Sequence, residues 1–231
     1  MKKLTSENKI FLSLMACWLI VGAGIQLVIP KGHEILWIND MHSPRLDAFF
    51  TLIYTCFGFN TSLPLFVALL LFVVFWSYGR ALQAFVNSYI VLLGIDFMHK
   101  FVTTSELNSR PTFFFGLQRL HTLPGIFLNG QSGYPAAASA GTFALFLFVL
   151  IHLADKRWSY VFFAIAILYS VSRLYVFQNF FDAVYAGSAI GVGSTLLVSP
   201  MLNCKYYQSI KWKDRSLYRD IRSLIGKLIK S

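Results

Sequence analysis

Long apolar runs, separated by short polar segments, recur along the whole chain. Most of these runs approach the roughly 20 residues that a helix needs to cross ~30 Å of hydrocarbon. The pattern therefore predicts six membrane-spanning helices. We place them at Ile10–Ile29, Leu63–Trp76, Ala81–Met98, Tyr134–Ala154, Trp158–Val176 and Phe180–Ser199.

A further segment, Pro44–Phe59, shows a different pattern. Its apolar residues recur at helical spacing on one face, and the segment is too short to be a span by itself. We expect an amphipathic helix lying in the membrane interface. Because only residues 60–64 separate it from the next apolar run, the alternative is that it forms the first half of a bent second span.

The composition agrees with a membrane protein. Of the 231 residues, 56% are hydrophobic and only 13% are charged, whereas a soluble domain of this size needs far more polar surface. We predict an all-α, polytopic membrane helix bundle, with six transmembrane helices and one interfacial helix, in residues 1–204. Residues 205–231 alternate basic and apolar residues, which favours a basic amphipathic helix on the cytoplasmic leaflet over an ordinary solvated helix.

The net charge of +10 is distributed in a way that argues against nucleic-acid binding, because the basic residues gather in short loops and at the chain ends. If both termini are cytoplasmic, fourteen of the twenty lysines and arginines lie on the inner side. This charge distribution predicts that the chain lies in the bilayer of the cell inner membrane.

The three cysteines show neither metal-ligand nor disulfide spacing, and we expect no metal and no cofactor.

Three cations near the outer ends of the predicted spans call for a functional hypothesis: Lys100, Arg110 and Arg173. The small residues after Gly133 begin another span on the same side, where Pro135 suits the first turn of a helix. A helix N-terminus offers free N–H groups and a positive dipole end to an anion. Together these groups predict a phosphate-binding cleft on the outer face.

The order of these segments resembles the three motifs of the type 2 phosphatidic acid phosphatase/vanadium haloperoxidase superfamily, specifically its six-span bacterial lipid phosphatases. The first motif is a Lys followed by Arg-Pro, and Lys100 and Arg110-Pro111 match it. The second, Pro-Ser-Gly-His, reads Pro135-Ala136-Ala137-Ala138 here. In the third, Ser172-Arg173 match, but Asn179 stands where the family has His and Ala183 where it has Asp.

The resemblance assigns roles to these positions. The family's phosphate-holding positions correspond to Lys100, Arg110, Arg173, Ala136 and Ala137. Its general acid, nucleophile and orienting carboxylate correspond to Ala138, Asn179 and Ala183. An amide is not a usable nucleophile, and a methyl group donates no proton, so no catalytic position is intact. Asp182, next to Ala183, has no histidine to orient, and we expect the outer histidines at 33, 42, 99 and 121 to be surface or interface residues.

These observations favour a protein of lipid-phosphatase fold that binds a phosphorylated lipid, such as an isoprenoid phosphate or a phospholipid, without hydrolysing it. The loss of catalytic residues fits either a natural relative or a phosphatase disabled by substitution. One alternative is an active lipid phosphate phosphatase that uses unconventional residues. Another is a transporter or structural membrane protein with no lipid-phosphate role.

Overall fold

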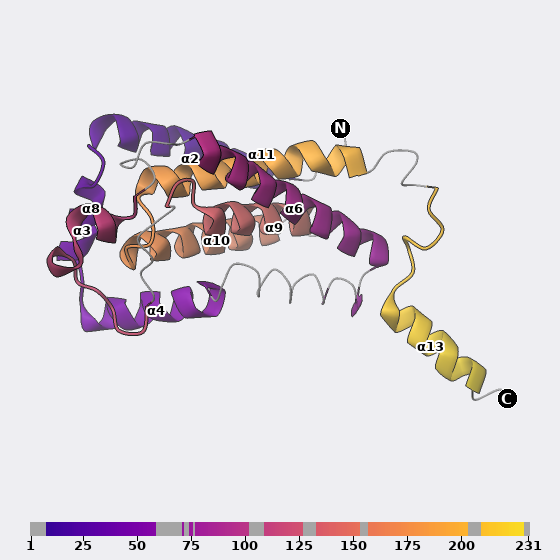
Figure 1. Ribbon diagram of the computed structural model, residues 1–231. Helices are drawn as coiled ribbons and strands as arrows, with labels where there is room; N and C mark the ends of the chain where they lie inside the picture. Colours follow the sequence, from indigo (N-terminus) through magenta and orange to yellow (C-terminus); the bar gives the residue numbers. More distant parts are fainter. Residues whose placement is uncertain are drawn as a thin grey trace.

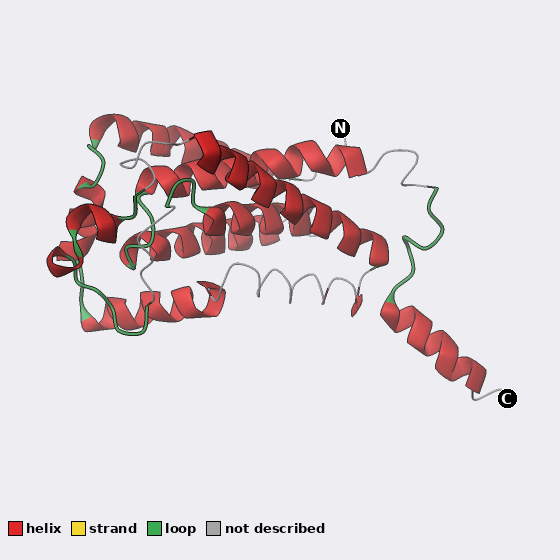
Figure 2. Ribbon diagram, in the orientation of Figure 1, coloured by secondary structure: helices red, strands yellow, loops and turns green. Residues whose placement is uncertain are grey.

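The computed structural model describes residues 8–58, 71, 74–75, 77–101, 109–126, 133–152, 157–202 and 209–228. Every regular element among them is a helix (Figure 2). The α-helices are α2 (Lys9–Val28), α3 (His33–Asp40), α4 (Pro44–Gly58), α6 (Tyr78–Phe101), α8 (Pro111–Phe115), α9 (Ala137–His152), α10 (Trp158–Tyr175), α11 (Phe181–Leu202) and α13 (Leu217–Leu228). A 3₁₀ turn, η1 (Leu117–Arg119), follows α8.

The predicted all-α membrane bundle is confirmed. Four of the six predicted spans appear as helices long and apolar enough to cross a membrane, namely α2, α6, α10 and residues 181–201 of α11. The fourth predicted span appears as α9, an apolar helix of 16 residues. Most of the second predicted span, Leu63–Trp76, lies outside the described residues. The segment predicted to be amphipathic is helical as α4, and its interfacial position stays a prediction.

The helices α9, α10 and α11 form the centre of the bundle, with α2, α4 and α6 packed around them (Figure 1). α11 approaches α9 so closely that two glycines of α11 have no room for a side chain. A Cβ at Gly187 would lie 2.4 Å from the carbonyl oxygen of Ala136, and one at Gly191 would lie 2.2 Å from that of Ala140. Small residues at a helix contact allow backbones to approach in a membrane, where burial of apolar surface drives association less.

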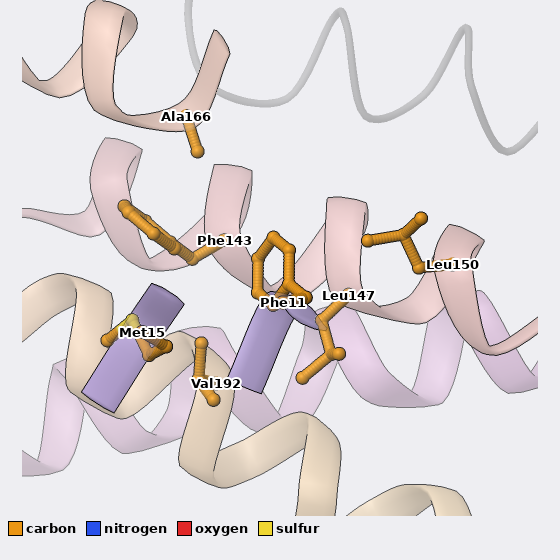
Figure 3. Packing of buried hydrophobic residues seen from close by; sticks show 7 residues of the cluster. All are labelled: Phe11, Met15, Phe143, Leu147, Leu150, Ala166 and Val192. Atoms are coloured by element: carbon orange, nitrogen blue, oxygen red, sulfur yellow. The ribbon is translucent and has the colours of Figure 1, made fainter. Parts of the chain in front are cut away.

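One cluster of buried apolar side chains joins α2 to this centre (Figure 3). Phe11 of α2 is fully buried and makes edge-on contacts with Phe143 of α9 and Phe163 of α10, at centroid distances of 6.5 and 5.4 Å. Met15 and Leu147 belong to the same cluster. Aromatic edge contacts of this kind each add about 0.5–1.5 kcal/mol beyond the area buried, so they help to hold α2 in place.

The C-terminal tail contacts the beginning of α6, a contact that the sequence did not predict. The backbone N–H groups of Tyr78 and Gly79 donate to the carbonyls of Arg215 and Lys213, both at 2.9 Å. The Tyr78 hydroxyl also donates to Asp220 of α13 at 3.1 Å. Helix N-termini leave their first N–H groups without intrahelical partners, and the tail satisfies two of them. The predicted helix in residues 205–231 is present as α13, while its membrane contact and the domain boundary stay predictions.

Candidate phosphate-binding site

The turn after α10 positions the third predicted motif. The N–H of Gln178 donates to the carbonyl of Arg173 at 2.9 Å, and that of Phe177 donates to Leu174 at 3.0 Å. Phe177 has a φ of 56°, so the turn is a Schellman motif with a phenylalanine in the left-handed position that glycine usually fills. The strain is of order 1–2 kcal/mol. Because the Phe177 ring is buried, its packing offsets this strain, and the turn holds Gln178 and Asn179 beside Arg173.

Two arginines are held by neutral amides at this place. Nη1 of Arg110 donates to Oε1 of Gln178, and Nε of Arg173 donates to Oδ1 of Asn179 at 3.2 Å. Burial lowers the pKa of Arg110, and the positive charge of Arg173 lowers it further. The two guanidinium groups are therefore close enough to repel each other.

The charge of this arginine pair is not compensated by any carboxylate in the part of the chain that the structure describes. Among the described residues, neither Arg110 nor Arg173 forms an ion pair with a carboxylate. Nε of Arg110 is buried and has no hydrogen-bond partner among them. A buried guanidinium donor without an acceptor is costly, and a bound anion would supply both the acceptor and the missing negative charge.

Two hydrogen bonds fasten the second predicted motif to the third. Nδ2 of Asn179 donates to the carbonyl of Gly133 at 2.7 Å, and the N–H of Ala136 donates to the carbonyl of Ala183 at 2.9 Å. The amide of Asn179 thus bridges Arg173 and the loop before α9, through its oxygen and its nitrogen respectively. Asn179 is 3% exposed, so both groups of its side chain are satisfied inside the protein.

The start of α9 differs slightly from the prediction. Pro135 was expected in the first turn of the helix, but α9 begins at Ala137, and Pro135 follows a cis peptide bond just before it. The physical reason is that the carbonyl of Ala136 accepts the first bond of the helix, from the N–H of Ala140 at 3.0 Å, so Pro135 lies before the helix. The next N–H groups of α9 still form a helix N-terminus, as predicted.

Three of the five substituted motif positions are buried near one another. Ala136 and Ala183 are both 2% exposed and belong to one apolar cluster. Ala138 is 5% exposed and packs against Ile53 of α4 and Tyr169 of α10. A larger side chain at position 138 would therefore have to displace Ile53 or Tyr169.

Two predicted phosphate-binding positions are not brought to the arginine pair by any contact among the described residues. Lys100 is exposed in the last turn of α6, immediately before a segment that lies outside the described part of the chain. Ala137 packs against the cluster formed by Val91 and Ile95 of α6. Their part in phosphate binding stays a prediction.

Asp182 does not act as a displaced orienting carboxylate. It forms an ion pair with Lys31, with 2.9 Å between Nζ and Oδ2, and its Oδ1 accepts the N–H of Ala183 at 2.6 Å. The ion pair holds the start of α11 against the segment between α2 and α3, whereas the hydrogen bond lies within the first turn of α11. The interpretation that Asp182 orients nothing in the site agrees with this geometry.

The sequence reasoning missed two side chains of the site. Gln178 holds Arg110, and the guanidinium carbon of Arg173 lies 5.4 Å from the ring centroid of Tyr54. A cation over an aromatic face is stabilised by the ring quadrupole. The pair Gln178-Asn179 directly after an apolar span was a visible signal for buried amides, whereas nothing in the sequence indicated that Tyr54 would reach Arg173.

Comparison with known proteins places this geometry in a structural class. No protein-family model matches the chain, and neither does any curated protein. Among solved structures, the chain is similar to the crystal structure of the first transmembrane PAP2-type phosphatidylglycerolphosphate phosphatase from Bacillus subtilis. The two chains are 18% identical, the match covers 88% of this chain and 98% of the other, and the TM-score is 0.59.

The helices and this likeness together define the class of protein. The chain is a helical membrane protein, and it has the fold of a PAP2-type transmembrane lipid phosphatase. At 18% identity the likeness concerns the fold alone. What the site does follows from the residues that occupy it.

Proposed function

We propose that this protein binds the phosphate group of a membrane lipid between Arg110 and Arg173 and does not hydrolyse it. The observation that carries the proposal is the arginine pair, in which two partly buried guanidinium groups donate to amide oxygens and form no ion pair with a carboxylate among the described residues. Arg side chains suit phosphate because their planar donors match its oxygens. The unpartnered Nε of Arg110 supplies one donor for such an oxygen.

A lipid is the favoured source of the phosphate. The solved structure of similar fold is described as a phosphatidylglycerolphosphate phosphatase, which acts on a phosphorylated lipid. Here the arginine pair lies where α10 ends, in a bundle whose outer surfaces are apolar, as in the exposed Phe85 and Phe97 of α6. A lipid in the surrounding bilayer would keep its tails in hydrocarbon while its phosphate reached the end of α10.

The charge distribution supports a site on the outer face of an inner membrane. Helix α2 begins, and α11 ends, at the end of the bundle opposite α3 and α8 (Figure 1). Most lysines and arginines lie near that first end or in the tail, which the positive-inside rule places in the cytoplasm. The arginine pair belongs to the opposite end, which is the outer one in this orientation.

The absence of hydrolysis follows from the chemistry of Asn179 and Ala138. The side-chain amide of Asn179 accepts a hydrogen bond from Arg173 and donates one to the carbonyl of Gly133. An amide nitrogen does not attack phosphorus. The methyl group of Ala138 cannot protonate a leaving oxygen, a contribution usually worth about 10²–10⁴ in rate. The site therefore retains groups that bind phosphate and lacks the nucleophile and the general acid that phosphate hydrolysis requires.

A binding experiment tests the first half of the proposal. We expect the purified full-length protein in detergent to bind phosphatidic acid more tightly than phosphatidylcholine. Arg110→Ala or Arg173→Ala should weaken this binding by roughly 10–100-fold, because a charged hydrogen bond contributes about 1.5–3 kcal/mol. Arg119→Ala is the matched control, since Arg119 is an exposed arginine of the same outer segment. Equal losses in all three variants, or none, would exclude the arginine pair as the binding site and favour a transporter or structural role.

A restoration experiment tests the second half. The protein as it stands should release no phosphate from phosphatidic acid or phosphatidylglycerol phosphate. The combined changes Ala136→Ser, Ala137→Gly, Ala138→His, Asn179→His and Ala183→Asp should produce phosphate release. Hydrolysis by the unmodified protein that disappears in Arg173→Ala would instead identify an active phosphatase with unconventional residues.

A further inference from the structure

A cluster of histidine and carboxylate side chains lies apart from the arginine pair. Nδ1 of His42 is 2.7 Å from Oδ1 of Asp47, and Nε2 of His121 is 3.1 Å from Oδ2 of the same carboxylate. The two imidazole rings lie 4.5 Å apart between centroids. Three separate segments meet here: the loop before α4, the first turn of α4, and the segment after η1.

The surroundings fix these three side chains in place. The Tyr175 hydroxyl donates to Oδ1 of Asp47 at 2.6 Å, and the Tyr175 ring lies 4.1 Å from that of His42. The backbone N–H of His121 donates to Oδ1 of Asn39 at 2.7 Å, which anchors the outer segment. Metal-binding carboxylates and histidines are typically oriented by outer hydrogen bonds of this kind.

We propose that His42, Asp47 and His121 form a binding site for a divalent transition-metal ion of the zinc class. The ligand atoms of the three side chains all lie within 4.8 Å of one another. Two imidazoles and one carboxylate are a donor set that such ions prefer, whereas Mg²⁺ and Ca²⁺ prefer oxygen donors alone. Ligands around a tetrahedral zinc ion stand about 3.4 Å apart, given bonds of 2.0–2.2 Å. The two nitrogen–oxygen separations of 2.7 and 3.1 Å are shorter than this, and the ligand atoms span up to 4.8 Å, so ion binding would move the two rings slightly away from Asp47 and toward each other.

The position of His42 shows which ring nitrogen would bind the ion. Nδ1 faces Asp47 at 2.7 Å, whereas Nε2 is buried and has no hydrogen-bond partner among the described residues. Nδ1 is therefore the ligand atom, and Nε2 would carry the proton of the metal-bound ring. His121 is the opposite case, because its side chain is 52% exposed and leaves a coordination position open to water.

A bound ion would join parts of the chain that are distant in sequence. Asp47 and His121 are 74 residues apart, and the ion would tie their segments to the end of α10 through Tyr175. Binding to the folded state alone raises its stability by mass action. The ion would thus hold the loop before α4, the first turn of α4 and the segment after η1 together, near the end of α10, the helix that carries Arg173.

Zinc titration of the full-length protein tests this proposal. The protein, freed of affinity tag and treated with chelator, is titrated with Zn²⁺ by calorimetry in detergent, and thermal unfolding is followed with and without the ion. We expect one Zn²⁺ per chain, little binding of Mg²⁺, and a higher unfolding temperature with Zn²⁺. His121→Ala and Asp47→Asn should each weaken Zn²⁺ binding by at least about tenfold, since losing an outer-shell partner alone costs 10–100-fold.

His33→Ala is the matched control, because His33 is an exposed histidine in the first turn of α3 on the same outer side. It should bind Zn²⁺ within twofold of the unmodified protein. His121 is exposed, so its replacement leaves the fold intact. Tyr175→Phe gives a further check, because it removes one hydrogen bond to Asp47 and keeps all three ligands. The proposal is overturned if the unmodified protein binds Zn²⁺ no more tightly than His121→Ala, or if His33→Ala weakens binding equally.

Discussion

Replacing Gly187 with alanine should force α11 away from the start of α9. A Cβ at Gly187 would lie 2.4 Å from the carbonyl oxygen of Ala136 and 3.2 Å from its carbonyl carbon. Ordinary contact between a methyl group and these atoms begins near 3.4 Å, so the two backbones must separate by about 1 Å. Ala136 cannot yield easily, because its N–H is bonded to Ala183 of α11.

The expected cost combines two effects of opposite sign. Overpacking of a tight contact typically destabilises by 1–3 kcal/mol. Alanine in place of glycine inside a helix stabilises by up to about 1 kcal/mol. Gly193 isolates the second effect, because it belongs to the same helix and a Cβ there meets nothing within 4 Å. We therefore expect Gly187→Ala to be less stable than Gly193→Ala by about 1–3 kcal/mol.

The measurement is unfolding of the full-length protein in mixed micelles by increasing SDS, followed by circular dichroism. Gly193→Ala should match or exceed the stability of the unmodified protein. Because the strained contact lies at the start of α9, Gly187→Ala should also weaken phosphatidic acid binding, while Gly193→Ala should not. If the two variants were equally stable, the close approach of α9 and α11 described above would be wrong.

Two other contacts lead to predictions that the same unfolding measurement checks. Asp182→Ala removes both the ion pair with Lys31 and the bond to the N–H of Ala183, so it should cost about 0.5–2 kcal/mol. Lys31→Ala removes the same partly exposed ion pair and the contact of the Lys31 ammonium group with the Phe180 ring, and it should lower the free energy of unfolding by about 0.5–1.5 kcal/mol. A larger loss in Lys31→Ala than in Asp182→Ala would contradict a stabilising bond between Asp182 and the N–H of Ala183. Thr195→Val leaves the buried Nδ2 of Asn87 without its acceptor at 3.1 Å. Its free energy of unfolding should be lower by about 0.6–1.7 kcal/mol. An unchanged free energy of unfolding would show that this bond between α6 and α11 contributes nothing to stability.

The sequence predicted the helices well because membrane spans are a local property. Each apolar run must satisfy its own backbone hydrogen bonds inside the bilayer, so length and hydropathy alone indicate a helix. The errors are at boundaries, as at Pro135, which lies just before α9 because the first bond of that helix is accepted by the carbonyl of Ala136. The resemblance to lipid phosphatases correctly predicted the fold from the order of its three motifs, although identity to the solved neighbour is only 18%.

The contacts within the site depended on tertiary structure much more than the positions of the helices did. Arg110 and Arg173 were predicted as phosphate ligands, but the amides that hold them were not, because Gln178 reaches Arg110 only through the turn at Phe177. A phenylalanine in the left-handed position has no signature in the sequence, since glycine is the residue expected there. That turn is permitted by the burial of the Phe177 ring.

By itself, the sequence determined that this protein is a helical membrane bundle. It also showed which basic residues lie at the ends of the predicted spans, and at which motif positions this chain differs from the family that it resembles. Only the tertiary structure decided which of those groups meet. It joined the arginines through Gln178 and Asn179, directed Asp182 to Lys31 instead, and left Lys100 without a contact to the arginine pair among the described residues. The physical reason is that helix formation follows from nearby residues, whereas a site is made by side chains whose positions depend on how distant helices pack.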